Sequence, residues 1–151
     1  MRSIFALAVL TATLAYTTAQ NNLNSRADSI LGVYRGEQRG DVFKARITKQ
    51  PDGCYRGQIF WLERDRDSRG NKLLDVKNPD KNLRSTPRDQ VVLFEELRYN
   101  PQKQRWDGTK IYDPQRGFKA NLTAEFTKEG ELRLTGTVMG MSGHFVWKKI
   151  E

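Results

Sequence analysis

The chain has 151 residues, a formal net charge of +8 and 37% hydrophobic residues. This length suits one domain with a substantial core, and the single cysteine excludes a fold held together by internal disulfides. Basic and acidic residues are mixed along the chain, which is typical of a solvated surface, and no basic-aromatic recognition motif is present. We therefore expect no nucleic-acid partner.

The N-terminus has the three parts of a secretory signal peptide. Residues 1–3 include an arginine, residues 4–16 form an apolar run and residues 17–19 are small. The apolar run is too short to span a bilayer, which needs roughly 20 apolar residues. We therefore expect a signal peptide over residues 1–19, cut before Gln20, and export to the periplasm or the extracellular space. The alternative is an N-terminal anchor that is retained.

Residues 20–28 are polar and predict a flexible tail ahead of a single domain over residues 29–151. In this domain, short runs rich in β-branched and aromatic residues are separated by turn signals. The third run begins at Cys54, whose place at the start of an apolar strand predicts a buried, unreactive thiol. The predicted strands cover residues 30–35, 42–48, 54–62, 90–99, 105–112, 118–126, 132–138 and 145–147.

About eight strands joined mostly by short turns predict an all-β fold, an antiparallel meander that closes into a small barrel. A barrel of this size either fills itself with side chains or holds one small ligand. The side chains expected to point inward are small and large in alternation, which suits a filled interior and a narrow cavity equally well. The small ones are Ala45, Gly57, Gly108, Ala120, Ala124 and Gly136.

One connection, residues 63–89, is much longer than the turns and contains the pattern D-x-x-N-P-D-x-x-L-R-S-x-P from Asp75 to Pro87. Loops longer than about 12–15 residues are usually functional or disordered. Asn78 before a proline favours a turn, and Asp75 and Arg84 have the charges and geometry of a bidentate ion pair. We expect an ordered lid that either plugs one barrel end or contacts a ligand.

A second pattern, W-x-G-x-K-I-Y-D-P over residues 106–114 with Gly117 after it, accompanies the loop pattern. Together they resemble the DUF2147 family of bacterial exported proteins. Residues 30–34 resemble the family's opening segment, with Tyr34 where tryptophan is usual, and residues 145–147 resemble its last strand. The resemblance covers essentially the whole domain and implies export and a small lipocalin-like β-barrel. It implies no activity, because the family has none established.

An aromatic and basic row is predicted on one face of the strand over residues 105–112. Such a row can bind an anionic or sugar ligand by charge and stacking, or it can be a core row whose lysine reaches the barrel mouth. Our leading hypothesis is an exported, non-catalytic binding module for a small apolar or anionic ligand, or for a cell-envelope partner, near residues 75–87. The candidate ligand-binding residues are Asp75, Asn78, Arg84, Trp106, Lys110 and Tyr112.

Two other functions stay open. A hydrolase acting on envelope material would need carboxylates that converge in one cleft, and the candidates are Asp75, Asp107 and Asp113. A purely structural or interaction protein would need no ligand and would favour a fully packed barrel. The oligomeric state does not follow from the sequence.

Metal and cofactor sites are not predicted. His144 is the only histidine and Cys54 the only cysteine, which argues against a transition-metal site. The segment beginning at Asp65 starts like a calcium loop but has Arg69 and Val76 where oxygen ligands are required. We expect no cofactor and no membrane-spanning segment.

Overall fold

The structure is a computed structural model that describes residues 23–151; the expected signal peptide, residues 1–19, and residues 20–22 lie outside that range. Within residues 23–151 the chain forms eight strands and four short 3₁₀ helices. The strands are β1 (Gly32–Gln38), β2 (Asp41–Lys49), β3 (Tyr55–Leu62), β4 (Val92–Asn100), β5 (Arg105–Asp113), β6 (Phe118–Phe126), β7 (Leu132–Val138) and β8 (Met141–Lys149). The 3₁₀ helices are η1 (Leu23–Ser25), η2 (Ala27–Ile30), η3 (Lys81–Leu83) and η4 (Arg88–Gln90).

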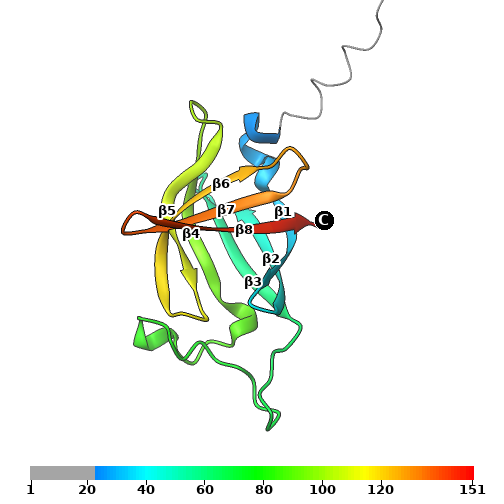
Figure 1. Cartoon of the computed structure of the whole chain (residues 1–151), viewed down its shortest axis with the longest axis vertical. Coiled ribbons are helices and arrows are strands. Elements are labelled where there is room, and N and C mark those ends of the chain that lie inside the picture. The colour runs from blue at the N-terminus through cyan, green and yellow to red at the C-terminus, as the bar shows by residue number, and fades with distance from the viewer. Residues whose placement is uncertain (1–22) are drawn as a thin grey trace, which may run out of the picture.

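The predicted antiparallel meander barrel is confirmed. Each strand pairs with the next, and β8 returns to β1 through Tyr34 opposite Lys149 and Arg35 opposite Lys148, which closes the sheet (Figure 1). Alternating sequences make such strands because neighbouring side chains point to opposite faces. On β6 the side chains that fill the interior are Ala120, Leu122, Ala124 and Phe126. No helix within residues 23–151 is long and apolar enough to cross a bilayer.

The last strand begins four residues earlier than predicted. The turn before β8 is a two-residue turn in which Met139 and Gly140 both have positive φ, 49° and 80°. Turns of this kind match the twist of the flanking strands. Ser142 and Gly143, which we expected in the turn, therefore pair with Thr137 and Gly136.

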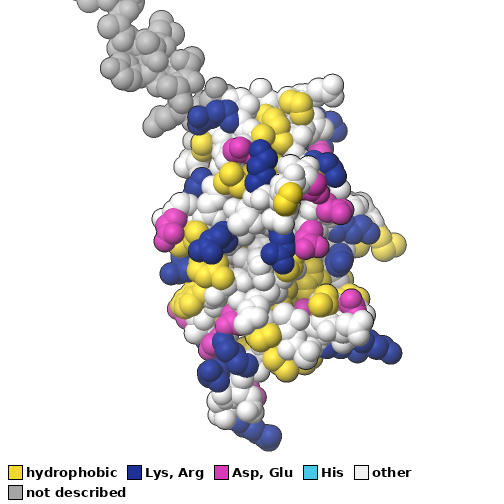
Figure 2. Space-filling view, turned by 180° about the vertical axis from the view of Figure 1, so that it is seen from behind, with side chains coloured by type: hydrophobic (Ala, Val, Ile, Leu, Met, Phe, Trp, Pro, Cys, Tyr) yellow, Lys and Arg dark blue, Asp and Glu magenta, His cyan; other side chains and the backbone are white. Residues whose placement is uncertain are grey.

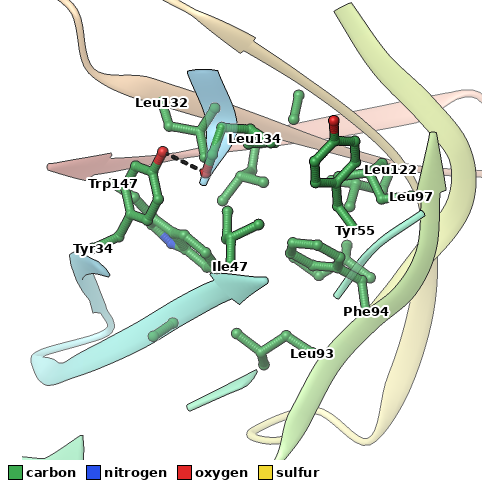
Figure 3. Packing of buried hydrophobic residues seen from close by; sticks show 14 of the residues in the cluster. Tyr34, Ile47, Tyr55, Leu93, Phe94, Leu97, Leu122, Leu132, Leu134 and Trp147 are labelled. Carbon is green, nitrogen blue, oxygen red and sulfur yellow. Dashed lines mark hydrogen bonds between the residues drawn. The ribbon is translucent and has the colours of Figure 1, made fainter. Parts of the chain in front are cut away.

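Aromatic rings centred on Trp147 form the middle of the core. The Trp147 ring lies 6.1 Å from Tyr34, 5.6 Å from Phe43 and 6.5 Å from Phe94, measured between centroids. The Tyr34 hydroxyl donates a hydrogen bond of 2.8 Å to the Ile30 carbonyl (Figure 3). Burial raises the pKa of that hydroxyl, so it stays protonated. Residues from β1, β2, β4 and β8 thus meet across the barrel.

One end of the barrel is closed by residues 23–30, and we call it the closed end. The predicted flexible tail is not found over residues 23–28, because η1 and η2 pack across the barrel end there (blue in Figure 1). The Asn24 side chain donates to the Phe126 carbonyl at 2.9 Å and accepts from the Phe126 amide at 2.7 Å. Trp106 donates from Nε1 to the Ala27 carbonyl at 3.0 Å. Apolar side chains at Leu23, Ala27 and Ile30 supply the burial.

The opposite end carries the long connection between β3 and β4, and we call it the open end (lower part of Figure 1). This connection is ordered, as predicted. Isolated bridges join Arg66 to Lys72 and Leu74 to Pro87. The Lys72 ammonium also contacts the carboxylates of Asp65, at 2.6 Å, and Asp89. The polar connection is therefore held together by contacts between its own residues. The mouth of the barrel lies where this connection joins the strands.

A β-bulge in β5 changes which side chains enter the barrel. Trp106 lies opposite Ala124 on β6, but Thr109 lies opposite Leu122, so β5 has one extra residue between these pairs. Gly108 sits in the bulge with a φ of +89° and is exposed, so it is not one of the inward small residues. The prediction that Trp106, Lys110 and Tyr112 share a face is wrong for this reason: Trp106 points inward and the other two point outward.

Candidate ligand-binding cavity

The barrel interior is hollow toward the open end. The cavity has a volume of about 320 Å³, at the lower end of the roughly 300–1,000 Å³ that ligand pockets occupy. Its inner wall is apolar and comes from seven strands, β2 to β8. The lining residues of this wall are Phe43, Ile59, Leu93, Ile111, Ala120, Gly136, Phe145 and Trp147.

Glycines opposite aromatic rings help to keep this space free. A Cβ at Gly36 would lie 2.3 Å from the Phe43 ring, and a Cβ at Gly57 would lie 2.5 Å from the Phe94 ring. The rings of Phe43 and Phe94 therefore pack directly against the backbone of the neighbouring strand at these glycines. Phe43 lines the cavity wall in this position. Replacing Gly36 would push the Phe43 ring off the wall and toward the space a ligand would use.

The mouth of the cavity is polar, and its carboxylates already have partners. Asp41 accepts from Arg64 at 2.5 Å and from Gln115 Nε2 at 2.8 Å. Asp113 accepts from Gln38 Nε2 at 3.0 Å and from the backbone amides of Gln115, at 2.9 Å, and the following residue. Both carboxylates are thus paired with a cation or hydrogen-bonded, so neither of them is an unpartnered charge at the mouth.

Arg88 is the cation at the mouth that lacks a partner. It lies in η4, and its backbone amide donates to the Leu73 carbonyl at 2.9 Å, which fixes its place at the mouth. Its half-buried side chain lines the cavity and makes no hydrogen bond or ion pair with any residue in the range 23–151, and its Nε is buried without a partner. Gln115 Oε1 is a second buried polar atom without a partner. The mouth therefore offers one donor and one acceptor.

A buried latch holds the long connection to the barrel wall. The Asp75 carboxylate, only 1% exposed, accepts from the Tyr112 hydroxyl and from Asn78 Nδ2, each at 2.7 Å. The expected ion pair between Asp75 and Arg84 does not form, because Arg84 Nε donates instead to the Asn78 carbonyl at 2.8 Å. Neutral donors satisfy the carboxylate in this latch.

The Tyr112 hydroxyl must stay protonated to act as a donor, and its surroundings favour that form. Burial, the hydrogen bond to Asp75 and the negative charges of Asp75 and Asp113 all raise its pKa. The nearby positive charge of Arg88 acts in the opposite sense. Tyr112 therefore points outward to the latch and, because it lies near the end of β5, also borders the cavity at its mouth.

The structure brings four of the six candidate residues together. Asp75, Asn78, Arg84 and Tyr112 form or adjoin the latch, and among the six Tyr112 alone lines the cavity. Lys110 is exposed in a groove on the outer wall, where β4 and β5 pair only at residues 98–100 and 105–107 and then diverge.

One further candidate stands apart from this cluster, and one site residue was not predicted. Trp106 lies at the closed end, hydrogen-bonded to η2. Arg88 was missed because nothing in the sequence separates it from the other arginines of the connection; its only signal is its place directly after Pro87, where the loop returns to the barrel.

The three candidate carboxylates do not converge. Asp107 lies opposite Arg98 in the half of β5 near the closed end and accepts from Arg105 at 3.1 Å. Asp75 is occupied in the latch, and Asp113 is at the mouth. Within residues 23–151 no group of three or more His, Cys, Asp or Glu side chains is placed to hold a metal ion.

An eight-stranded meander barrel with a cavity at one end has the architecture of the lipocalins. A protein from the human pathogen Helicobacter pylori, described as belonging to the lipocalin family, matches with a TM-score of 0.61, over 81% of this chain and 83% of that chain. The two sequences are 22% identical, so the likeness shows the fold. The chain itself belongs to the bacterial family DUF2147, described as "Uncharacterized protein conserved in bacteria", whose model matches residues 32–149. The comparison with curated proteins gives no match.

Proposed function

We propose that the protein is an exported, non-catalytic binding module for a small amphipathic ligand with an acidic group. The apolar part of the ligand lies against the cavity wall around Ile59, Leu93 and Trp147, and the acidic group lies at the mouth beside Arg88. The observation that carries the proposal is the unpartnered Arg88 side chain at the mouth of an otherwise apolar cavity.

An acidic group is the partner that Arg88 lacks. Leaving a buried donor without a partner costs about 1–3 kcal/mol, so a ligand that accepts a hydrogen bond there recovers this free energy. The planar guanidinium fits a carboxylate or phosphate with two parallel hydrogen bonds. Arg64 and Arg116, the other arginines at the mouth, face Asp41 at 2.5 Å and Asp113 at 3.8 Å. Arg88 is therefore the guanidinium available to a ligand among the described residues at the mouth.

A pair of ligands that differ only in the head group tests this assignment. Dodecanoate and dodecanol share one alkyl chain, and calorimetric titration measures their affinities for the purified protein. We expect dodecanoate to bind more tightly, and Arg88→Gln to lower its affinity about tenfold to a hundredfold, since hydrogen bonds to charged groups contribute about 1.5–3 kcal/mol. Dodecanol should bind Arg88→Gln and the unchanged protein equally.

Arg64→Gln is the matched control, because it removes a guanidinium at the same mouth that already has an acidic partner. It should reduce dodecanoate affinity less than Arg88→Gln does. Equal affinities of the unchanged protein for the two ligands, or no binding of either, would remove the proposed role. The cavity also weighs against a purely structural protein, for which we expected a fully packed interior.

Export is part of the proposal and is supported by the N-terminal pattern of residues 1–19. Mass spectrometry of the protein isolated from its own cells should find a chain that begins at Gln20 in the envelope or secreted fraction. A chain that keeps Met1 and stays in the cytoplasmic fraction would contradict export and leave the cavity argument untouched.

A further inference from the structure

Exposed apolar side chains gather at the open end. Within the described residues ten large hydrophobic side chains are exposed, and six of them lie at the open end. Four of these border the mouth or the strand turns beside it, and we call them the apolar lip. The lip consists of Val76, Phe118, Met139 and Met141, with Met139 94% and Met141 75% exposed.

The lip is continuous in space although its residues are distant in sequence. Phe118 and Met141 both line the mouth of the cavity, and Met139 lies at the tip of the turn that precedes Met141. The segment with Val76 reaches the same place because Lys77 Nζ donates to the Gln115 carbonyl at 2.8 Å. The contact is close, since a Cβ at Gly117 would lie 2.5 Å from the Lys77 carbonyl oxygen.

The charges beside the lip are basic. Lys77, Arg116 and Lys119 adjoin it, and the Arg116 guanidinium lies 5.8 Å over the Phe118 ring. Among the nearby acids, Asp75 is 1% exposed and the Asp113 side chain 13% exposed. Glu37 is exposed but faces Arg35 at 3.6 Å, and the exposed Asp80 follows Lys77 by three residues. The lower part of Figure 2 shows hydrophobic side chains exposed beside basic ones.

We propose that the apolar lip docks on an anionic lipid bilayer, so that the cavity mouth faces the membrane. Apolar side chains flanked by Lys and Arg bind at the boundary of head groups and acyl chains, and each cation near an anionic surface strengthens the attraction. A second copy of the chain fits less well, because two basic rims would oppose each other. Docking in this orientation lets an amphipathic ligand pass between bilayer and barrel without crossing water.

Vesicle co-sedimentation tests the proposal with the purified protein. One set of vesicles is phosphatidylcholine alone, and the other contains about one quarter phosphatidylglycerol. We expect binding to the anionic vesicles that weakens with salt, because surface charges are screened. The double substitution Val76→Ser with Met139→Ser, at two lip residues that do not line the cavity, should lower the partition coefficient at least about tenfold.

The matched control removes two other exposed apolar side chains, Val146→Ser with Ile150→Ser, which lie away from the mouth. It should bind vesicles like the unchanged protein. No binding to either vesicle, or equal losses in the two double variants, would overturn the proposal. Self-association in sedimentation velocity that the lip variant abolishes would instead assign the lip to a second copy.

The proposal stands apart from ligand binding in the cavity, and the same variants separate the two. The lip variant should bind free dodecanoate with unchanged affinity, since Val76 and Met139 do not line the cavity and Arg88 is retained. Lost vesicle binding with intact dodecanoate binding supports docking by the lip. Lost vesicle and dodecanoate binding together would mean that the substitutions disturb the cavity and would overturn the separate role of the lip.

Discussion

The two ends of the barrel are built by different means. At the closed end Trp106 is fully buried against Tyr99 and Phe126, at 5.2 and 5.7 Å. There η1 bonds to strand backbone, and η2 accepts hydrogen bonds from strand side chains. At the open end polar side chains bond mainly to one another around a cavity. Of the four buried side-chain atoms without a partner within residues 23–151, three lie at the open end. The closed end is thus closely packed, whereas the open end has buried polar atoms without a partner that a ligand can bind.

The largest effect should come from Trp106→Ala. It removes a fully buried ring and its hydrogen bond to η2, and aromatic-to-alanine changes in a core cost about 3–5 kcal/mol. The free energy of unfolding, measured with urea, should fall by this amount. Phe118→Ala, which truncates a partly exposed ring at the open end, should cost much less. Similar losses would contradict the contrast between the ends.

A smaller effect is expected from cutting the latch with Tyr112→Phe. The buried Asp75 carboxylate then loses a donor, at a cost of about 1–3 kcal/mol. Amide hydrogen exchange within residues 75–87 should speed up, because the connection is no longer held to β5. Tyr99→Phe is the control at the closed end: its hydroxyl donates to the neutral Asn24 carbonyl at 2.7 Å, so its loss should cost less. A larger loss for Tyr99→Phe would refute this ranking.

Asp28 makes the closed end sensitive to acid. Hydrogen bonds from Tyr55, at 2.6 Å, and Lys49, at 2.9 Å, hold the pKa of its carboxyl below the ordinary 3.8. A lowered pKa in the folded state stabilises the protein above pH 3.8, and this contribution disappears as the pH falls through the folded value.

Asp28→Asn tests this pH dependence. The substitution should lower the urea midpoint at neutral pH and make little difference in strong acid, below the folded pKa of Asp28. A gap between the two proteins that widens on acidification would contradict the assignment.

The smallest effect on stability should come from Arg88→Gln. The Arg88 side chain makes no hydrogen bond or ion pair within residues 23–151, so the free energy of unfolding should change by no more than about 0.5 kcal/mol. Thermal unfolding without ligand checks this. A large loss would show that Arg88 supports the fold and would weaken its assignment to a ligand.

Most of the barrel could be predicted because its strands alternate plainly. Residues 118–126 show why: apolar and polar side chains alternate without interruption, and burial follows that pattern from residue 119 to residue 126. The strand order could also be predicted from the sequence, because strands joined by a short turn usually pair with each other. The bulge at Gly108 could not be predicted, because a glycine in a strand is equally compatible with regular pairing.

The candidate site was predicted only in part. The 75–87 pattern marked the latch, and Tyr112 was identified, but the partner of Asp75 was a phenol on the barrel rather than the nearby Arg84. Charge complementarity within a loop is visible in the sequence, whereas a contact between a loop and a distant strand depends on the fold. The cover formed by residues 23–28 was missed because polar composition hid two spaced apolar residues, Leu23 and Ala27.

The bulge in β5 determines which side chains of this strand face the cavity. Beyond it, Ile111 faces the cavity, while Lys110 and Tyr112 face the outer wall and the long connection. Deleting Gly108 would remove the extra residue and leave Ile111 inward, because the pairing of residues 109–113 with β6 would not change. A strand that kept Gly108 but paired without the bulge would instead turn Lys110 and Tyr112 inward and Ile111 outward. The one extra residue in β5 thus decides whether an aliphatic side chain or an ammonium and a phenol face the chamber.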